Sequence, residues 1–208
     1  MFIIKLHKSV LLTYLGVIFG VISMYFAFIK MAFSEISYLR YSLIFLILAG
    51  VCDMFDGKVA RMCKRTNQEK EFGIQIDSLA DTVNFVCLPV IIMLSLGMHS
   101  IVDIIAYILL ILCGISRLGF FNIIATTDEP VKYYSGLPVT TTAIIYPILG
   151  LLHGSIDEGA FRIIYIVATY LTAFLFVFNF KIPKFKGLFY VIVPILALIL
   201  VILLLVIR

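Results

Sequence analysis

Acidic side chains in the first half of the chain recur at helical spacing beside small residues. Asp53 and Asp56 are three residues apart and are followed by Gly57, Ala60 and Arg61. These five positions, at i, i+3, i+4, i+7 and i+8, fall on one stripe of a helix. Carboxylates that line one helix face are suited to binding cations or moving protons, provided that a second group of ligands faces them.

A second stripe follows after a polar connection. Gly73, Asp77, Asp81 and Asn84 stand at i, i+4, i+8 and i+11, and eleven residues separate this stripe from Arg61. The connection makes the two helices antiparallel neighbours. At about 1.5 Å of rise per residue, the innermost aspartate of each stripe lies about 12 Å from the connection. All four carboxylates are therefore expected to converge.

Four converging carboxylates need compensating positive charge, because each disfavours ionisation of the others. Lys58 and Arg61 could supply part of it, but two divalent cations balance four carboxylates. None of the three histidines lies near the stripes, and an all-oxygen ligand set favours Mg²⁺ or Mn²⁺ over Zn²⁺. Two such ions form the clamp used in phosphoryl chemistry, where they neutralise a diphosphate and stabilise the leaving oxygen.

The small residues on the first stripe have two interpretations. Gly57 and Ala60 leave space for a bulky ligand against the helix backbone. They would equally allow two membrane helices to pack closely, as small residues on a helix face commonly do.

The elements that position these residues are expected to be membrane helices. Hydrophobic residues make up 63% of the 208-residue chain, charged residues 13%, and the mean hydropathy is +1.16. Soluble domains are about 45–50% apolar and about 25% charged, so a water-soluble enzyme is excluded. The four cysteines lack CxxC spacing, which argues against a disulfide scaffold or a zinc ribbon. The net charge of +4 bears on membrane topology and anionic lipid rather than on nucleic acid.

Apolar stretches of about 20 residues recur along the chain and predict an all-α polytopic membrane bundle. The expected spans lie near Ser9–Ile29, Ser37–Arg61, Gly73–Leu96, Ile101–Ile124, Ser135–His153, Ala160–Phe180 and Gly187–Ile207. With the N-terminus in the cytoplasm, twelve lysines and arginines lie inside and four outside. The positive-inside rule then places the connection at 61–73 on the cytoplasmic face. No repeat or linker divides the chain, so residues 1–208 are expected to form one domain.

The two stripes together resemble the signature of the CDP-alcohol phosphotransferase family. That signature reads D-x2-D-G-x2-A-R, a spacer, and G-x3-D-x3-D, and this chain carries every fixed position. The one departure is the eleven-residue spacer, which is slightly longer than is usual and falls in the predicted connection.

The resemblance implies six core transmembrane helices, here with one or two further C-terminal membrane helices. It also implies a homodimer, an active site open to the cytoplasm, and cleavage of a CDP-linked lipid or alcohol at its diphosphate. By motif position, two metal ions would be held by Asp53, Asp56, Asp77 and Asp81. Asp81 would also be the general base. The nucleotide and its phosphates would lie against Gly57, Ala60, Arg61 and Gly73.

Three further stretches resemble the phosphatidylserine synthase branch of that family. They are residues 74–90 (IQIDSLADTVNFVCLPV), residues 113–122 (CGISRLGFFN), and Gly136-Leu137-Pro138. This resemblance implies transfer of a phosphatidyl group from CDP-diacylglycerol to L-serine, with release of CMP, in the plasma membrane of a bacterium or archaeon.

The acceptor alcohol is the least determined part of this interpretation. Arg117 is expected near the cytoplasmic end of its helix, where it could bind the carboxylate of serine. It would equally suit a phosphate on glycerol 3-phosphate or inositol phosphate, or could simply extend to the membrane interface. The alternatives are therefore the same chemistry with another acceptor, such as those phosphates or an amino alcohol, or a cation transporter that uses the aspartates as an ion site.

Overall fold

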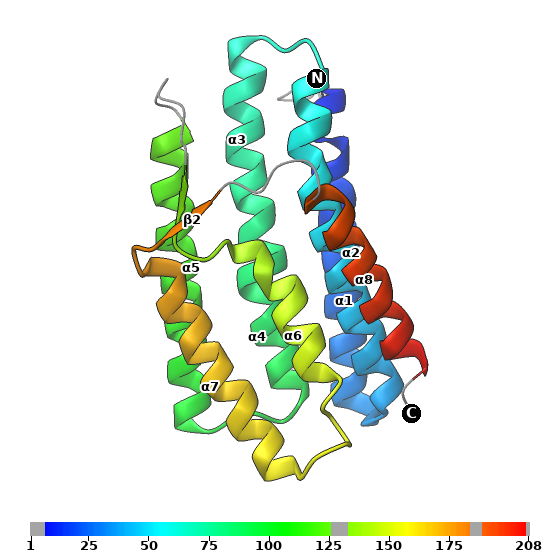
Figure 1. The fold of residues 1–208 in the computed structure, drawn as a ribbon. Helices are drawn as coiled ribbons and strands as arrows, with labels where there is room; N and C mark the ends of the chain where they lie inside the picture. Colours follow the sequence, from blue (N-terminus) through cyan, green and yellow to red (C-terminus); the bar gives the residue numbers. More distant parts are fainter. Residues whose placement is uncertain (1–6, 126–132, 184–188, 207–208) are drawn as a thin grey trace.

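The computed structural model describes residues 7–125, 133–183 and 189–206, and it forms a bundle of mostly α-helical segments (Figure 1). In chain order the elements are η1 (Lys8–Val10), α1 (Leu11–Phe33), α2 (Ile36–Met62), α3 (Asn67–Asp81), η2 (Thr82–Cys87), α4 (Leu88–Ser95), α5 (Ile101–Ala125), β1 (Tyr133–Ser135), η3 (Val139–Thr141), α6 (Thr142–Gly150), α7 (Glu158–Val177), β2 (Lys181–Pro183) and α8 (Phe189–Val206). The predicted helical membrane bundle is confirmed at this level.

Within the described residues, four helical stretches are long and apolar enough to cross a membrane. They are Lys8–Phe33, Asn67–Ser95, Ile101–Ile123 and Glu158–Val177. Two shorter apolar helices, Val139–Gly150 and Tyr190–Val206, accompany them. α2 has 27 residues and packs against α1, and its charged residues are concentrated toward its C-terminal end. The predicted spans thus coincide with helices in position. The ends of the last predicted span, Gly187 and Ile207, lie outside the described residues.

The helix that includes α6 is shorter than the sequence predicts. The expected span began at Ser135, but Tyr133–Ser135 form strand β1 and the helical turn starts at Val139, directly after Pro138. β1 pairs antiparallel with β2, with Tyr134 opposite Ile182. The sequence did not predict this pair, which joins the segment before α6 to the segment after α7.

A turn of π-helix interrupts the long helix that begins with α3. η2 (Thr82–Cys87) directly follows Asp81 and leads into α4. Pro89 has no N–H to donate, which disturbs the regular helical ladder at this point. The carbonyl of Phe85 instead accepts a hydrogen bond from Thr142 Oγ1 at 3.0 Å. α6 therefore satisfies a backbone group within the π-helical turn.

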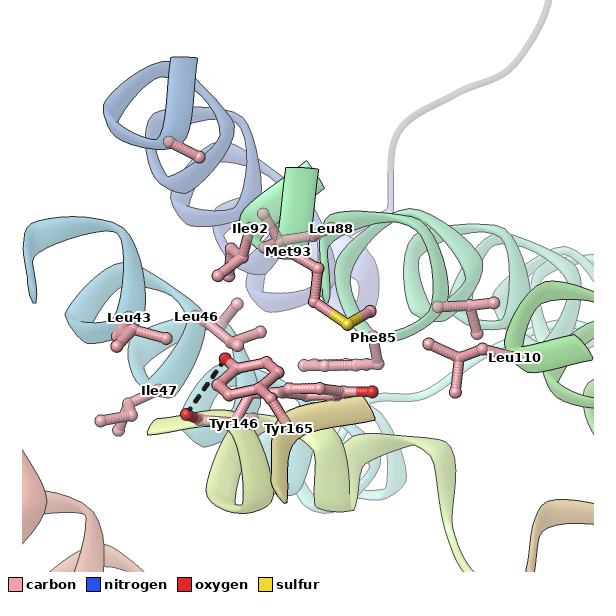
Figure 2. Packing of buried hydrophobic residues seen from close by; sticks show 14 of the residues in the cluster. Leu43, Leu46, Ile47, Phe85, Leu88, Ile92, Met93, Leu110, Tyr146 and Tyr165 are labelled. Carbon is pink, nitrogen blue, oxygen red and sulfur yellow. Dashed lines mark hydrogen bonds between the residues drawn. The ribbon is translucent and has the colours of Figure 1, made fainter. Parts of the chain in front are cut away.

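The apolar core lies between α2, η2, α4, α5, α6 and α7 (Figure 2). Tyr146 and Tyr165 are fully buried there, and their hydroxyls find polar partners, as buried tyrosines usually require. Tyr165 donates to the carbonyl of Tyr146 at 3.4 Å, and the Tyr146 hydroxyl lies 3.3 Å from Thr169 Oγ1. These contacts fix α6 against α7.

Some residues used in the charge count lie outside the described part of the chain. They are Lys5, Lys132, Lys184, Lys186 and Arg208.

Candidate metal and diphosphate site

The aspartates of α2 and α3 come together where these antiparallel helices face one another. Carboxylate oxygens of Asp53, Asp56 and Asp77 lie within 4.8 Å of one another. Asp81 joins them, because its side chain is within hydrogen-bonding reach of Asp53, and Asp56 and Asp77 are paired in the same way. Asp56 and Asp81 are only 6% and 9% exposed. We call these four residues the aspartate cluster; their convergence is the arrangement expected from the spacing.

The connection between α2 and α3 holds the two helices in this register (Figure 1). Thr66 is the N-cap of α3 and forms a reciprocal capping box with Glu69. The Thr66 N–H donates to Glu69 Oε2 at 2.7 Å, and the Glu69 N–H donates to Thr66 Oγ1 at 3.3 Å. Such a box satisfies amide groups that would otherwise lack partners at the start of a helix. α3 therefore begins at a defined residue, which fixes where its aspartates stand.

Helix α1 supplies a hydrogen-bond donor to the cluster that was not predicted from the sequence. Thr13 Oγ1 donates a hydrogen bond to Asp56 Oδ2 at 2.9 Å, and both groups are buried. The available signal was a stripe of small and polar residues along α1. Its buried residues are Thr13, Gly16, Gly20, Ser23 and Ala27. Such a stripe in an apolar span indicates a close helix contact, but spacing within α1 does not identify Asp56 as the partner.

The last polar residue of the second stripe also faces α1. Asn84 lies in η2 and is 2% exposed, and its Oδ1 atom has no hydrogen-bond partner in the part of the chain that the structure describes. A Cβ atom on Gly20 would collide with this oxygen. Only glycine at position 20 therefore lets α1 approach the π-helical turn that follows Asp81.

The signature glycines nearer the connection have open surroundings. A Cβ atom on Gly57 would meet only Arg61 Nη1, at 3.7 Å, and one on Gly73 only Arg65 Nη1, at 3.4 Å, within the described residues. By contrast, a Cβ on Gly50 would lie 2.6 Å from the Ala143 side chain of α6. Close helix packing thus explains Gly50 but neither signature glycine. Ala60, on the same face, is half-buried.

The cluster's negative charge has no counter-ion among the described residues, because no described lysine or arginine is within salt-bridge distance of it. Arg61 is exposed, and the Lys58 ammonium lies 5.7 Å from the centre of the Tyr190 ring. Buried carboxylates without compensating charge are strongly disfavoured. A compact set of carboxylate oxygens, supported by a hydroxyl donor, fits hard divalent cations. The cluster could therefore bind metal.

Arg117 lies on α5 and holds the turn before α6. It is 6% exposed, so it does not extend to the membrane interface. Its Nε donates to the carbonyl of Leu137, its Nη2 donates to that of Gly136 at 3.3 Å, and its guanidinium lies 4.3 Å from the Phe121 ring centre. Gly136 has a φ of +71°, and a Cβ there would lie 2.8 Å from the carbonyl oxygen of Phe176. The described geometry thus gives Arg117 a part in shaping this turn.

The fold and the site define a helical membrane protein with a carboxylate cluster, able to hold a metal ion, between two antiparallel helices. The chain belongs to the CDP-alcohol phosphatidyltransferase family, whose family model matches residues 6–207. This confirms the family suggested by the signature.

The chain matches relatives with named activities over only part of their length. The chain is 34% identical over 131 residues to the CDP-diacylglycerol–serine O-phosphatidyltransferase of Saccharomyces cerevisiae, covering 57% of this chain and 46% of that protein. It is 30% identical over 140 residues to the enzyme of the same name from Helicobacter pylori strain 26695, covering 65% and 57%. It is 34% identical over 102 residues to the archaetidylserine synthase of Methanothermobacter thermautotrophicus, covering 49% and 42%. The chain thus spans about half the length of these relatives.

Proposed function

We propose that this protein transfers the phosphatidyl group of CDP-diacylglycerol to L-serine, giving phosphatidylserine and CMP. The observation that carries the proposal is the convergence of the aspartate cluster at the signature positions of a family member. The choice of serine is supported by the names of the yeast and Helicobacter pylori relatives. The archaeal relative's name also specifies a serine headgroup.

The aspartate cluster would hold two divalent cations, Mg²⁺ or Mn²⁺. When bound, these ions neutralise the diphosphate and stabilise the leaving oxygen. Thr13 orients Asp56 within the cluster through its hydrogen bond. Asp81 lies deepest along α3 and, as general base, accepts the proton of the serine hydroxyl. The serine oxygen attacks the phosphorus bonded to diacylglycerol, the bond from that phosphorus to the bridging oxygen breaks, and CMP leaves.

The nucleotide would lie across the open faces of Gly57 and Gly73, beside Ala60, with Arg61 near the phosphates. This proposal is supported by the surroundings of both glycines, where a Cβ atom would meet only an arginine Nη1 atom among the described residues. Arg117 would contribute to the acceptor side, either by contacting the serine carboxylate or by holding the Gly136 turn that shapes that side.

We further propose that residues 1–208 act as one membrane domain in the plasma membrane of a bacterium or archaeon. The site would open to the cytoplasm, where L-serine is available, and CDP-diacylglycerol would enter from the bilayer. The chain would function as a homodimer, with no role for nucleic acid.

Replacing Asp56 or Asp77 by asparagine should abolish CMP release without preventing membrane insertion. Each change removes a charged ligand from the cluster while keeping the shape of the side chain. The measurement is CMP release from CDP-diacylglycerol and L-serine by the purified protein, with and without chelator. Chelation should also abolish the activity, and Mg²⁺ or Mn²⁺ should restore it.

Glu71→Gln is the matched control, because Glu71 is an exposed carboxylate on α3 away from the cluster. It should retain full activity. Wild-type turnover in either aspartate variant, or under thorough chelation, would reject the metal role. Faster CMP release with glycerol 3-phosphate, inositol phosphate or an amino alcohol would change the acceptor. Cation flux in liposomes without CMP release would instead favour a transporter.

A further inference from the structure

The connection between α2 and α3 directs one arginine onto the second stripe. Arg65 immediately precedes Thr66, the N-cap residue of α3, so the capping box fixes the backbone beside it. Its guanidinium folds over the first turns of α3, and Nη1 lies 3.4 Å from where a Cβ on Gly73 would be. Arg65 belongs to the eleven-residue spacer and occupies no fixed position of the signature.

This guanidinium has hydrogen-bonding capacity that the described chain does not use. The Nε atom of Arg65 is buried and has no hydrogen-bond partner among the described residues. No described carboxylate is within salt-bridge distance of the side chain. The nearby Glu69 already accepts hydrogen bonds from the Thr66 N–H at 2.7 Å and the Thr66 hydroxyl at 3.0 Å. Because an unpaired buried donor is unfavourable, an acceptor from outside the described residues is expected.

The position of Arg65 indicates what that acceptor is. Gly73 lies one helical turn from Asp77 on the side of the connection. The guanidinium therefore stands at the end of the aspartate cluster nearest the connection, which we call the mouth of the cluster. Across the mouth, Arg61 lies beside Gly57 in the same manner. An anion that extends from the cluster toward the connection would meet two guanidinium groups, which bind phosphate oxygens well.

We propose that Arg65 binds a phosphate oxygen of the nucleoside diphosphate at the mouth of the aspartate cluster. The inference rests on the proposed function, since it assumes that the site takes a CDP-linked substrate. It adds a ligand-binding residue supplied by the longer connection of this chain. Arg65 contacts substrate through charge and hydrogen bonds and takes no part in proton transfer.

The test is the affinity of the purified full-length protein for CDP in the presence of Mg²⁺, measured by isothermal titration calorimetry. CDP carries the diphosphate but no lipid, so binding to a lipid headgroup cannot account for the result. Arg65→Gln should weaken CDP binding by about ten- to hundredfold, the range for loss of a charged hydrogen bond. The KM for CDP-diacylglycerol should rise in parallel, while the KM for serine stays unchanged.

Lys64→Gln is the matched control, because it makes the same charge change at the adjacent exposed residue. It should stay within about twofold of wild type, the size expected for a screened surface charge. Unchanged CDP affinity in Arg65→Gln would overturn the inference, and so would an equal loss in Lys64→Gln. If Arg65→Gln loses its thermal unfolding transition, Arg65→Lys decides: several-fold weaker binding supports the inference, and wild-type affinity overturns it.

The two proposals fail in different ways. CDP binding that depends on Arg65, without CMP release toward any acceptor, would reject the proposed function alone. Serine-dependent CMP release with CDP binding that is indifferent to Arg65 would reject this inference alone. Absence of CDP binding to the wild-type protein would reject both.

Discussion

Thr13 supports the aspartate cluster from a helix that carries none of the signature residues. Its hydroxyl donates to Asp56 Oδ2 at 2.9 Å in a buried setting. A donor that orients a metal-binding carboxylate is typically important for metal affinity. Helix α1 is therefore part of the site as well as part of the bundle.

Thr13→Val should raise the divalent-cation concentration needed for half-maximal CMP release by about tenfold or more. Valine keeps the shape of threonine but leaves the carboxylate oxygen without its donor. Thr13→Ser keeps the hydroxyl and should remain close to wild type. The measurement is a Mg²⁺ titration of CMP release, and an unchanged midpoint in Thr13→Val would show that the hydrogen bond does not tune the cluster.

At the scale of residues, the placement of side chains that recur at helical spacing could be predicted, whereas contacts between distant segments could not. The four aspartates were predicted because each pair repeats within one helix. Thr13 was missed because its partner is 43 residues away. The position of Arg65 was missed because residues in a connection have no period that indicates where their side chains point.

At the scale of elements, the contact between α1 and η2 sets how closely these helices approach. Gly20 leaves room for the Asn84 side chain, whose Oδ1 atom stands where a Cβ on Gly20 would be. Asn84 comes three residues after Asp81, so displacement of this turn would also move the deepest aspartate of the cluster.

Gly20→Ala should destabilise the protein by about 1–3 kcal/mol, the usual cost of overpacking a buried site. Gly119→Ala is the control, because a Cβ on Gly119 of α5 meets no described atom within 4 Å. Asn84→Ala in the Gly20→Ala background should recover part of the loss, since it removes the colliding oxygen. Thermal unfolding in detergent measures all three. Equal stability of the two glycine variants would contradict the close contact.

The helices themselves were predictable because an apolar run of about 20 residues has few alternatives in a bilayer. The departures arise where a distant partner decides the local structure. η2 depends on Thr142, whose hydroxyl donates a hydrogen bond to the carbonyl of Phe85. β1 depends on β2, which lies more than 40 residues later. Neither partner is visible in the local hydropathy pattern.

At the scale of the whole molecule, the two ends of the bundle differ in charge. The α2–α3 connection carries Lys64 and Arg65, whereas the far end contains the ion pair between Arg162 and Asp103 at 3.1 Å. Outward-facing apolar side chains cover the helices between these ends, for example Ile105 and Leu112 of α5. The bundle therefore has the surface that a lipid bilayer requires, with an excess of positive charge beside the candidate site.

Because positive loops stay in the cytoplasm, the end that bears the aspartate cluster should face inward. Single cysteines in a background without the other native cysteines test this. Cys63 ends α2 beside the site, and an introduced Ser155→Cys lies in the exposed turn between α6 and α7, at the opposite end (Figure 1). In intact cells, a membrane-impermeant thiol reagent should label Ser155→Cys and spare Cys63. Inside-out vesicles should show the reverse. The proposed reaction requires the same labelling pattern, because L-serine must reach the cluster from the cytoplasm. Labelling of Cys63 from outside the cell would contradict both the topology and that route.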